Sequence, residues 1–142
     1  MDKNKLTKEL RRDEGVVPHA YQDHLGYLTI GVGRLIDKRK GGGLSDDEID
    51  YLLSNDINRF EKQVIDALPW YGKLDDVRQR VLVNMAFNMG IAGLLGFKNT
   101  LAMIERGDYA GAAKGMLASK WATQVGDRAK RLSKMMETGK DV

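Results

Sequence analysis

A long amphipathic segment in the first half of the chain most constrains what the chain can fold into. Ser45–Glu48 matches a capping box, and its acidic residues fall in a first helical turn, where the helix dipole favours negative charge. Pro69 stands where such a helix must end. Between these signals, apolar residues recur at helical spacings of three and four: Ile49, Leu52, Leu53, Ile57, Phe60, Val64 and Leu68. The segment predicts one long helix over residues 45–68.

The part before this helix is rich in glycine and in residues that favour strands. Leu6 and Leu10 lie four apart among charged residues and predict a short amphipathic helix over residues 3–13. Over residues 20–36, aromatic and β-branched residues alternate with glycines, which is typical of a hairpin or a small sheet. The lysines and glycines of residues 38–43 predict a loop.

The part after the long helix is predicted to be helical throughout. Glycines separate four apolar periodic segments, at residues 75–89, 99–106, 108–123 and 127–137. We therefore predict a mostly helical α+β fold in a single domain, residues 1–142. Its parts are a β-containing lobe (14–44), a connecting helix (45–68) and a helical lobe (1–13 with 69–142). A cleft between two lobes is a natural site for an extended polymer.

Composition excludes several kinds of site. The chain contains no cysteine, so it forms no disulfide and no thiolate metal site. Its two histidines, His19 and His24, belong to no metal-binding motif, and we expect neither a metal nor a cofactor. The formal charge of +3 is a mild excess that fits solvated helix faces or attraction to a polyanion. No nucleic-acid-binding motif is present, so we expect no nucleic-acid partner.

Nothing in the sequence predicts a membrane protein. No apolar run reaches the length of a membrane span, and the first five residues lack the apolar core of a signal peptide. We therefore expect no signal peptide, no transmembrane segment and no stable membrane insertion.

The chemistry lies in one stretch of twenty residues, from Glu14 to Gly33. Glu14 falls where a helix runs out, Asp23 falls on a predicted turn, and Thr29 supplies a hydroxyl on a predicted strand. Two carboxyl groups across a cleft can cleave a glycosidic bond, one as an acid and one as a base or nucleophile. The spacing alone equally fits a surface glutamate at a helix end and an aspartate in a turn.

An ordered set of motifs resembles the phage-type lysozymes, the glycoside hydrolase family of the T-even phage endolysins. The family pattern runs E-G, Y-x-D and G-x-x-T-I-G-x-G, and this chain matches it with Glu14-Gly15, Tyr21-Gln22-Asp23 and Gly26–Gly33. Three further segments resemble the family's central helix, the turn after it and its C-terminal segment: Asn84–Gly90, Gly96–Leu101, and Trp121 and Gln124 with Arg128–Arg131. The resemblance covers nearly the whole chain.

The resemblance implies an endolysin muramidase that hydrolyses the β-1,4 bond between N-acetylmuramic acid and N-acetylglucosamine. Glu14 would be the general acid, and Asp23 and Thr29 would position or activate the attacking water. The family inverts anomeric configuration, which suits carboxyl groups about 6.5 to 9.5 Å apart. The fold implied is lysozyme-like, with the two lobes flanking the cleft.

Further residues take their expected roles from the resemblance alone. Leu35, Phe87 and Thr100 occupy positions similar to those that line the family's sugar-binding cleft, although core packing is an equal alternative for Phe87. Supporting roles fall to Tyr21, to Gln124 and to Arg128, which resembles the arginine that pairs with the catalytic glutamate. One position departs from the family: many relatives have a histidine where this chain has Arg34, so an ion pair that uses that histidine is absent or rearranged.

Other functions stay open at this stage. A non-catalytic wall-binding or virion structural module would use the same fold without the reaction. A lytic transglycosylase would use one acid and no water, which the presence of Asp23 and Thr29 argues against. For the muramidase we expect peptidoglycan glycan strands as substrate, a monomer, a location in the host cytoplasm, and release to the wall through a holin-type pore or as part of a virion.

Overall fold

The computed structural model describes residues 1–36 and 42–142, so most of the loop predicted over residues 38–43 lies outside the described residues. The described chain divides into two compact units, Met1–Leu52 and Leu53–Val142, hereafter unit 1 and unit 2. Helices predominate and are accompanied by one small antiparallel sheet. The predicted α+β fold class is confirmed.

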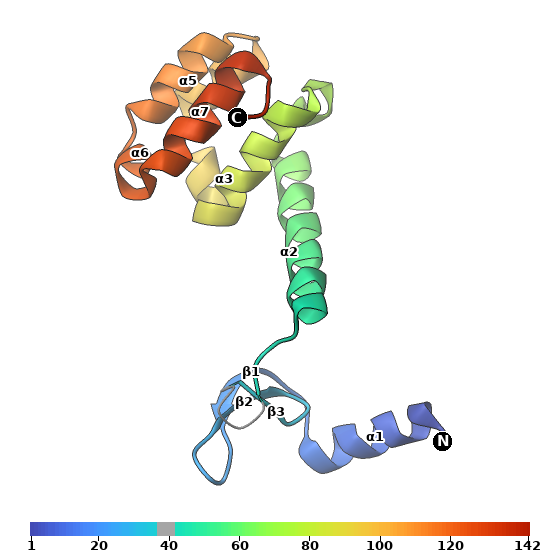
Figure 1. Cartoon of the computed structure of the whole chain (residues 1–142). Coiled ribbons are helices and arrows are strands. Elements are labelled where there is room, and N and C mark those ends of the chain that lie inside the picture. Colours follow the sequence, from blue (N-terminus) through green and yellow to red (C-terminus); the bar gives the residue numbers. More distant parts are fainter. Residues whose placement is uncertain (37–41) are drawn as a thin grey trace. The chain divides into compact units, whose positions relative to one another are not determined.

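Unit 1 contains the helix nearest the N-terminus, the sheet and the first residues of the long helix (Figure 1). Helix α1 (Lys3–Glu14) begins after Asp2, whose carboxylate accepts a hydrogen bond from the backbone N–H of Lys5 at 3.0 Å. The three strands pair in the order β1-β2-β3 and are antiparallel: β1 (Val17–Gln22), β2 (Leu28–Gly31) and β3 (Arg34–Leu35). Both the short helix and the small sheet agree with the sequence pattern.

Helix α2 (Asp46–Ala67) is the long helix that the amphipathic pattern predicts, and its residues are divided between the two units. Ser45 precedes it, and the carboxylate of Glu48 accepts hydrogen bonds from the Ser45 backbone N–H at 3.0 Å and from the Ser45 hydroxyl at 2.8 Å. The backbone bond is the glutamate half of the predicted capping box. The helix ends two residues before Pro69.

Unit 2 is helical apart from its connections, as predicted. After α2 come a short 3₁₀ turn and five helices: η2 (Tyr71–Lys73), α3 (Asp76–Leu95), α4 (Lys98–Glu105), α5 (Tyr109–Leu117), α6 (Lys120–Val125) and α7 (Asp127–Thr138). Figure 1 shows α7 running beside α5, and these two helices contact each other.

Two helices differ from the predicted boundaries. The helix predicted over 75–89 is followed at once by a second helical segment, and the joint is Gly90, whose φ of 79° and ψ of 163° are not helical. The helix predicted over 108–123 is two helices, because Ser119 begins a new one: its hydroxyl accepts a hydrogen bond from the Ala122 N–H at 3.2 Å. Serine competes for the backbone in this way at helix ends, and apolar periodicity does not register the change.

The hydrophobic core lies in unit 2. Every hydrophobic side chain that is buried among the described residues falls between Val64 and Met136, and the largest fully buried ones include Leu82, Met85 and Met116. In unit 1, Thr29 is the only buried side chain among the described residues. Apolar burial, the largest favourable contribution to folding, is therefore concentrated in unit 2.

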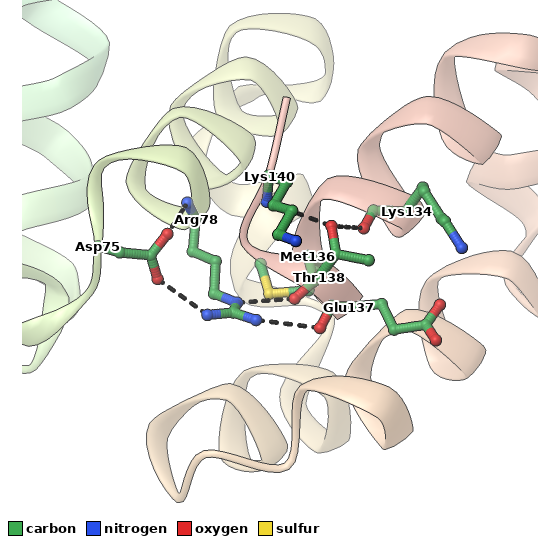
Figure 2. Close-up of polar contacts among 7 residues, drawn as sticks. All are labelled: Asp75, Arg78, Lys134, Met136, Glu137, Thr138 and Lys140. Carbon is green, nitrogen blue, oxygen red and sulfur yellow. Dashed lines mark hydrogen bonds and ion pairs between the residues drawn. The ribbon is translucent and has the colours of Figure 1, made fainter. Parts of the chain in front are cut away.

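One arginine ties the start of α3 to the end of α7 (Figure 2). Arg78 donates from Nε to the Met136 carbonyl at 2.7 Å and from Nη2 to the Glu137 carbonyl at 3.0 Å. A third donor, Nη1, lies 3.0 Å from an Asp75 carboxylate oxygen. Helix C-terminal carbonyls have no partner inside their own helix. Arg78 therefore supplies partners to α7 from a different helix.

Candidate active site

Glu14 is the last residue of α1. Gly15 follows it with φ 77° and ψ 166°, and its N–H bonds the Arg11 carbonyl at 3.1 Å, which closes the helix. The Glu14 side chain is exposed and makes no hydrogen bond or ion pair with the described residues. A negative charge at a helix C-terminus opposes the helix dipole. Helix stability therefore does not account for a glutamate at this position.

Asp23 lies in the turn between β1 and β2, as predicted. One carboxylate oxygen, Oδ1, accepts hydrogen bonds from the backbone N–H groups of Leu25 and Tyr27, both at 2.9 Å. Gly26 completes the turn with φ 85°. These bonds fix the carboxylate relative to the backbone, while Oδ2 accepts no hydrogen bond from the described part of the chain. One oxygen of Asp23 is therefore structural and the other is available to a ligand.

The backbone of Tyr27 connects Asp23 to Thr29. Its N–H donates to Asp23 Oδ1, and its carbonyl accepts from the Asp23 N–H at 2.8 Å and from the Thr29 hydroxyl at 3.0 Å. Thr29 is 3% exposed. Because the hydroxyl proton is engaged by the Tyr27 carbonyl, the remaining capacity of Thr29 Oγ1 is as an acceptor. The sequence motif includes Tyr27 only as a variable position, so its coupling role was not predicted.

The sheet register brings three predicted residues into one row. Thr29 in the middle strand pairs directly with Tyr21 of β1 and with Leu35 of β3. Side chains of directly opposed residues lie on the same face of a sheet and contact one another. Tyr21 and Leu35 are both partly buried. The three residues therefore belong to one surface, although Tyr21 and Leu35 are fourteen positions apart in the sequence.

Arg34, the departure from the family pattern, has an acidic partner in this chain. Its Nη1 lies 2.8 Å from Glu48 Oε1 and donates to the Gly43 carbonyl at 2.9 Å. The Arg34 guanidinium and the Ser45 N–H hold the pKa of Glu48 at about 2, well below its ordinary value of 4.5. The capping glutamate of α2 thus also anchors β3, a link that the capping-box pattern alone does not indicate.

Unit 2 contains a groove that includes two of the predicted residues. Its volume is about 550 Å³, and Asn84, Phe87 and Arg128 lie along it. Arg128 donates to Asn84 Oδ1 from Nε at 3.0 Å and from Nη2 at 2.8 Å. The Phe87 ring is 39% exposed and lies 5.3 Å from the Phe60 ring. Phe87 thus has one face in packing and another open to the groove.

The other predicted residues of unit 2 lie outside this groove's lining. Thr100 is 6% exposed in α4 and lies against Gly115 of α5. Gln124 is exposed on α6. In the same helix, Trp121 donates from its indole N–H to Asn88 Oδ1 at 2.8 Å. Asn84 and Asn88 were not predicted as functional residues, although both fall inside the Asn84–Gly90 motif.

No group of three histidine, cysteine, aspartate or glutamate side chains in residues 1–36 and 42–142 could hold a metal ion. No single helix in these ranges has both the length and the apolar composition to cross a membrane; α3 and α4 meet that test only as a pair bent by 104°.

The predominance of helices and the small antiparallel sheet are consistent with a lysozyme-like α+β fold. The chain belongs to the phage lysozyme family, which it matches over residues 11–137. Its class is therefore that of a muramidase-like peptidoglycan hydrolase, and the resemblance in the sequence motifs is confirmed.

Relatives of this chain occur in Dictyostelium discoideum and in two bacteriophages. The chain is 31% identical to the probable T4-type lysozyme 1 of Dictyostelium discoideum, over 92% of each protein. It is 30% identical to the pre-baseplate central spike protein Gp5 of Enterobacteria phage T4, over 94% of this chain and 28% of that protein. It is 28% identical to the peptidoglycan hydrolase gp36 of Pseudomonas phage phiKMV, over 91% of this chain and 15% of that protein.

Proposed function

We propose that this chain is an endolysin that hydrolyses the β-1,4 bond between N-acetylmuramic acid and N-acetylglucosamine with inversion at the anomeric carbon. The observation that supports this best is the fixed Asp23–Tyr27–Thr29 arrangement, which leaves Asp23 Oδ2 and Thr29 Oγ1 as acceptors. A water between two acceptors points a lone pair away from both. That is the orientation a nucleophilic water requires.

In the proposed reaction, Glu14 is protonated and gives its proton to the departing glycosidic oxygen. The water donates one hydrogen bond to Asp23 Oδ2 and one to Thr29 Oγ1 and attacks the anomeric carbon from the opposite face. The C–O bond to the leaving sugar breaks as the new C–O bond forms, and Asp23 takes the proton of the water. No covalent sugar–enzyme adduct forms. Proton exchange with solvent then returns Glu14 and Asp23 to their starting states.

The remaining predicted roles are part of the same proposal. Leu35, Phe87 and Thr100 would contact the sugar chain, and Tyr21, Gln124 and Arg128 would support the catalytic residues. The assignment of residues to lobes, the monomeric state, action in host cell lysis and release through a holin-type pore are proposed with it.

A second candidate is a virion structural module, and one relative favours it. The spike protein Gp5 of phage T4 is named as a pre-baseplate component and contains a region 30% identical to this chain. On this reading the chain would bind wall or a virion partner without turnover. Both candidates predict wall binding, so only the products separate them.

The deciding experiment is digestion of purified peptidoglycan by the parent protein and by Glu14→Gln. Glutamine keeps the size of the side chain and removes the acid. Glu9→Gln is the matched control, because Glu9 is an exposed glutamate of the same helix. Mass spectrometry of released fragments should show hydrated, reducing muramic acid ends from the parent and from Glu9→Gln only. Anhydro ends would indicate a transglycosylase, and intact wall with all three folded proteins would favour the structural module.

A third variant, Asp23→Asn, separates charge from fold in the same assay. An asparagine oxygen can still accept the hydrogen bonds of Leu25 and Tyr27, so the turn should persist. Loss of a proton acceptor should lower turnover by about 10²-fold or more. Unchanged turnover in Asp23→Asn would remove Asp23 from the mechanism.

A further inference from the structure

The Glu14 carboxyl group lies against a residue that has no side chain. Gly33 is in the turn between β2 and β3, and a β-carbon built on it would lie 2.7 Å from Glu14 Oε2 and 3.2 Å from Glu14 Cδ. Real β-carbons essentially never approach another heavy atom closer than 3.0 Å. The carboxyl group therefore occupies space that any other residue at position 33 would fill. Within unit 1 the carboxyl group makes no hydrogen bond or ion pair with another described residue, and Oε2 is the far end of a flexible side chain, so a side chain at position 33 would displace it.

The neighbouring glycine of the same motif shows that backbone geometry alone does not explain this contact. Gly31 has φ 70° and Gly33 has φ 67°, both in the left-handed region where a side chain is strained. A β-carbon on Gly31 would meet nothing within 4 Å. Backbone conformation thus favours glycine at both positions, but only at position 33 would an added side chain also displace the Glu14 carboxyl group.

The turn that carries Gly33 is held on both sides. Ile30 and Arg34 are paired across the β2–β3 ladder, immediately outside the turn. Arg34 is itself bound to Glu48 and to the Gly43 carbonyl. Strand pairing and the Arg34–Glu48 ion pair hold the backbone of this turn in place. A side chain added at position 33 would therefore displace Glu14 rather than the turn.

We propose that Gly33 is a positioning residue for Glu14: its missing side chain provides the seat that places the acid for proton transfer. The inference rests on the proposed role of Glu14 and extends it to a second residue. A displacement of about 1 Å at a reacting group can lower the rate about 10²-fold. An added methyl group at position 33 would force a displacement of this kind.

The test compares Gly33→Ala with Gly31→Ala. Both variants place an L side chain at a positive φ, so both carry a similar backbone strain, but only Gly33→Ala collides with Glu14. With a wall-derived glycan of defined length, kcat of Gly33→Ala should fall about 10²-fold below that of Gly31→Ala, with KM little changed. Circular dichroism and thermal unfolding should show both variants folded. Equal losses in the two variants would overturn the proposal.

A spectroscopic readout keeps this test independent of turnover. The carboxyl ¹³C resonance of Glu14 can be assigned as the signal that Glu14→Gln removes. It should move in Gly33→Ala and stay in place in Gly31→Ala. An unmoved signal in Gly33→Ala would refute the positioning role of Gly33 even if the parent is an active muramidase. If the parent has no muramidase activity but the signal still moves in Gly33→Ala, the positioning role of Gly33 is supported while the proposed function fails.

Discussion

At the scale of single residues, Arg34 and Glu48 form an ion pair of 2.8 Å that links β3 to the first turn of α2. The pKa of Glu48 is lowered from 4.5 to about 2, chiefly by the hydrogen bond from Arg34 and then by the Ser45 N–H. A carboxyl group with a lowered folded-state pKa adds stability above its unfolded pKa and loses it as pH falls through the folded value. Glu48 should therefore stabilise the protein above about pH 4.5 and cease to do so near pH 2.

Glu48→Gln tests this dependence. The unfolding temperature of the variant should be below that of the parent by a constant amount above about pH 4.5, and the difference should shrink between pH 4.5 and 2. Because both side chains are partly exposed, high salt should also reduce the difference. Glu105→Gln, at an exposed glutamate of α4, should follow the parent. A pH-independent gap between Glu48→Gln and the parent would mean that the ion pair is not its cause.

At the scale of elements, Arg78 connects helices that are adjacent in space and distant in sequence. Its guanidinium donates to the Met136 and Glu137 carbonyls near the end of α7 and pairs with Asp75 (Figure 2). It also lies 3.6 Å from the centroid of the Tyr109 ring, and the Arg78 side chain is only 13% exposed. Burial alone would raise the pKa of Asp75, but hydrogen bonds from Arg78 outweigh it and hold that pKa below its ordinary value. The Arg78 guanidinium therefore connects Asp75, Tyr109 and the end of α7.

Arg78→Met should destabilise the protein by about 1 to 3 kcal/mol, because it leaves the part-buried Met136 carbonyl, the Glu137 carbonyl and Asp75 without their charged partner. Arg80→Met is the matched control: Arg80 lies in the same helix and also pairs with aspartates, but its side chain is 49% exposed. The unfolding midpoint of Arg80→Met should stay close to that of the parent, because exposed ion pairs contribute little to stability. Urea denaturation of both variants measures the difference, and equal midpoints would refute the capping role of Arg78.

At the scale of the whole molecule, the two units differ in how much apolar surface they bury. The buried hydrophobic side chains of the described chain all lie in unit 2, whereas Thr29 is the single buried side chain described in unit 1. Regions with few buried apolar contacts open at lower free energy than the global unfolding transition. Glu14 and Asp23, the proposed acid and base, thus belong to the unit with less apolar packing of its own.

Hydrogen exchange should reveal this asymmetry. Amides in β1, β2 and β3 should exchange through openings of lower free energy than amides in α3, α5 and α7. Mass spectrometry of peptic fragments under native conditions measures both sets in one sample. Protection of the sheet equal to that of α3 would show that the two units unfold as one.

Much of the fold could be predicted because its signals are local. The short first helix, the small sheet and the long helix between Ser45 and Pro69 follow from periodicity, caps and breakers in a few neighbouring residues. The errors occurred where a local feature overrides periodicity: Gly90 interrupts a helix with a non-helical backbone, and Ser119 starts a new helix in an apolar pattern that continues. The family and the positions of its motif residues were also within reach of the sequence.

By itself the sequence determined the element types, the family and the identity of the candidate acid, base and hydroxyl, because these depend on residue order and short-range spacing. Only the tertiary structure decided which groups touch. Strand register placed Thr29 between Tyr21 and Leu35, and the turn at Gly33 brought that residue against Glu14. Helix packing gave α7 its partner in Arg78. The physical reason is that a contact between distant residues depends on the path of all the backbone between them. A short sequence pattern does not determine that path.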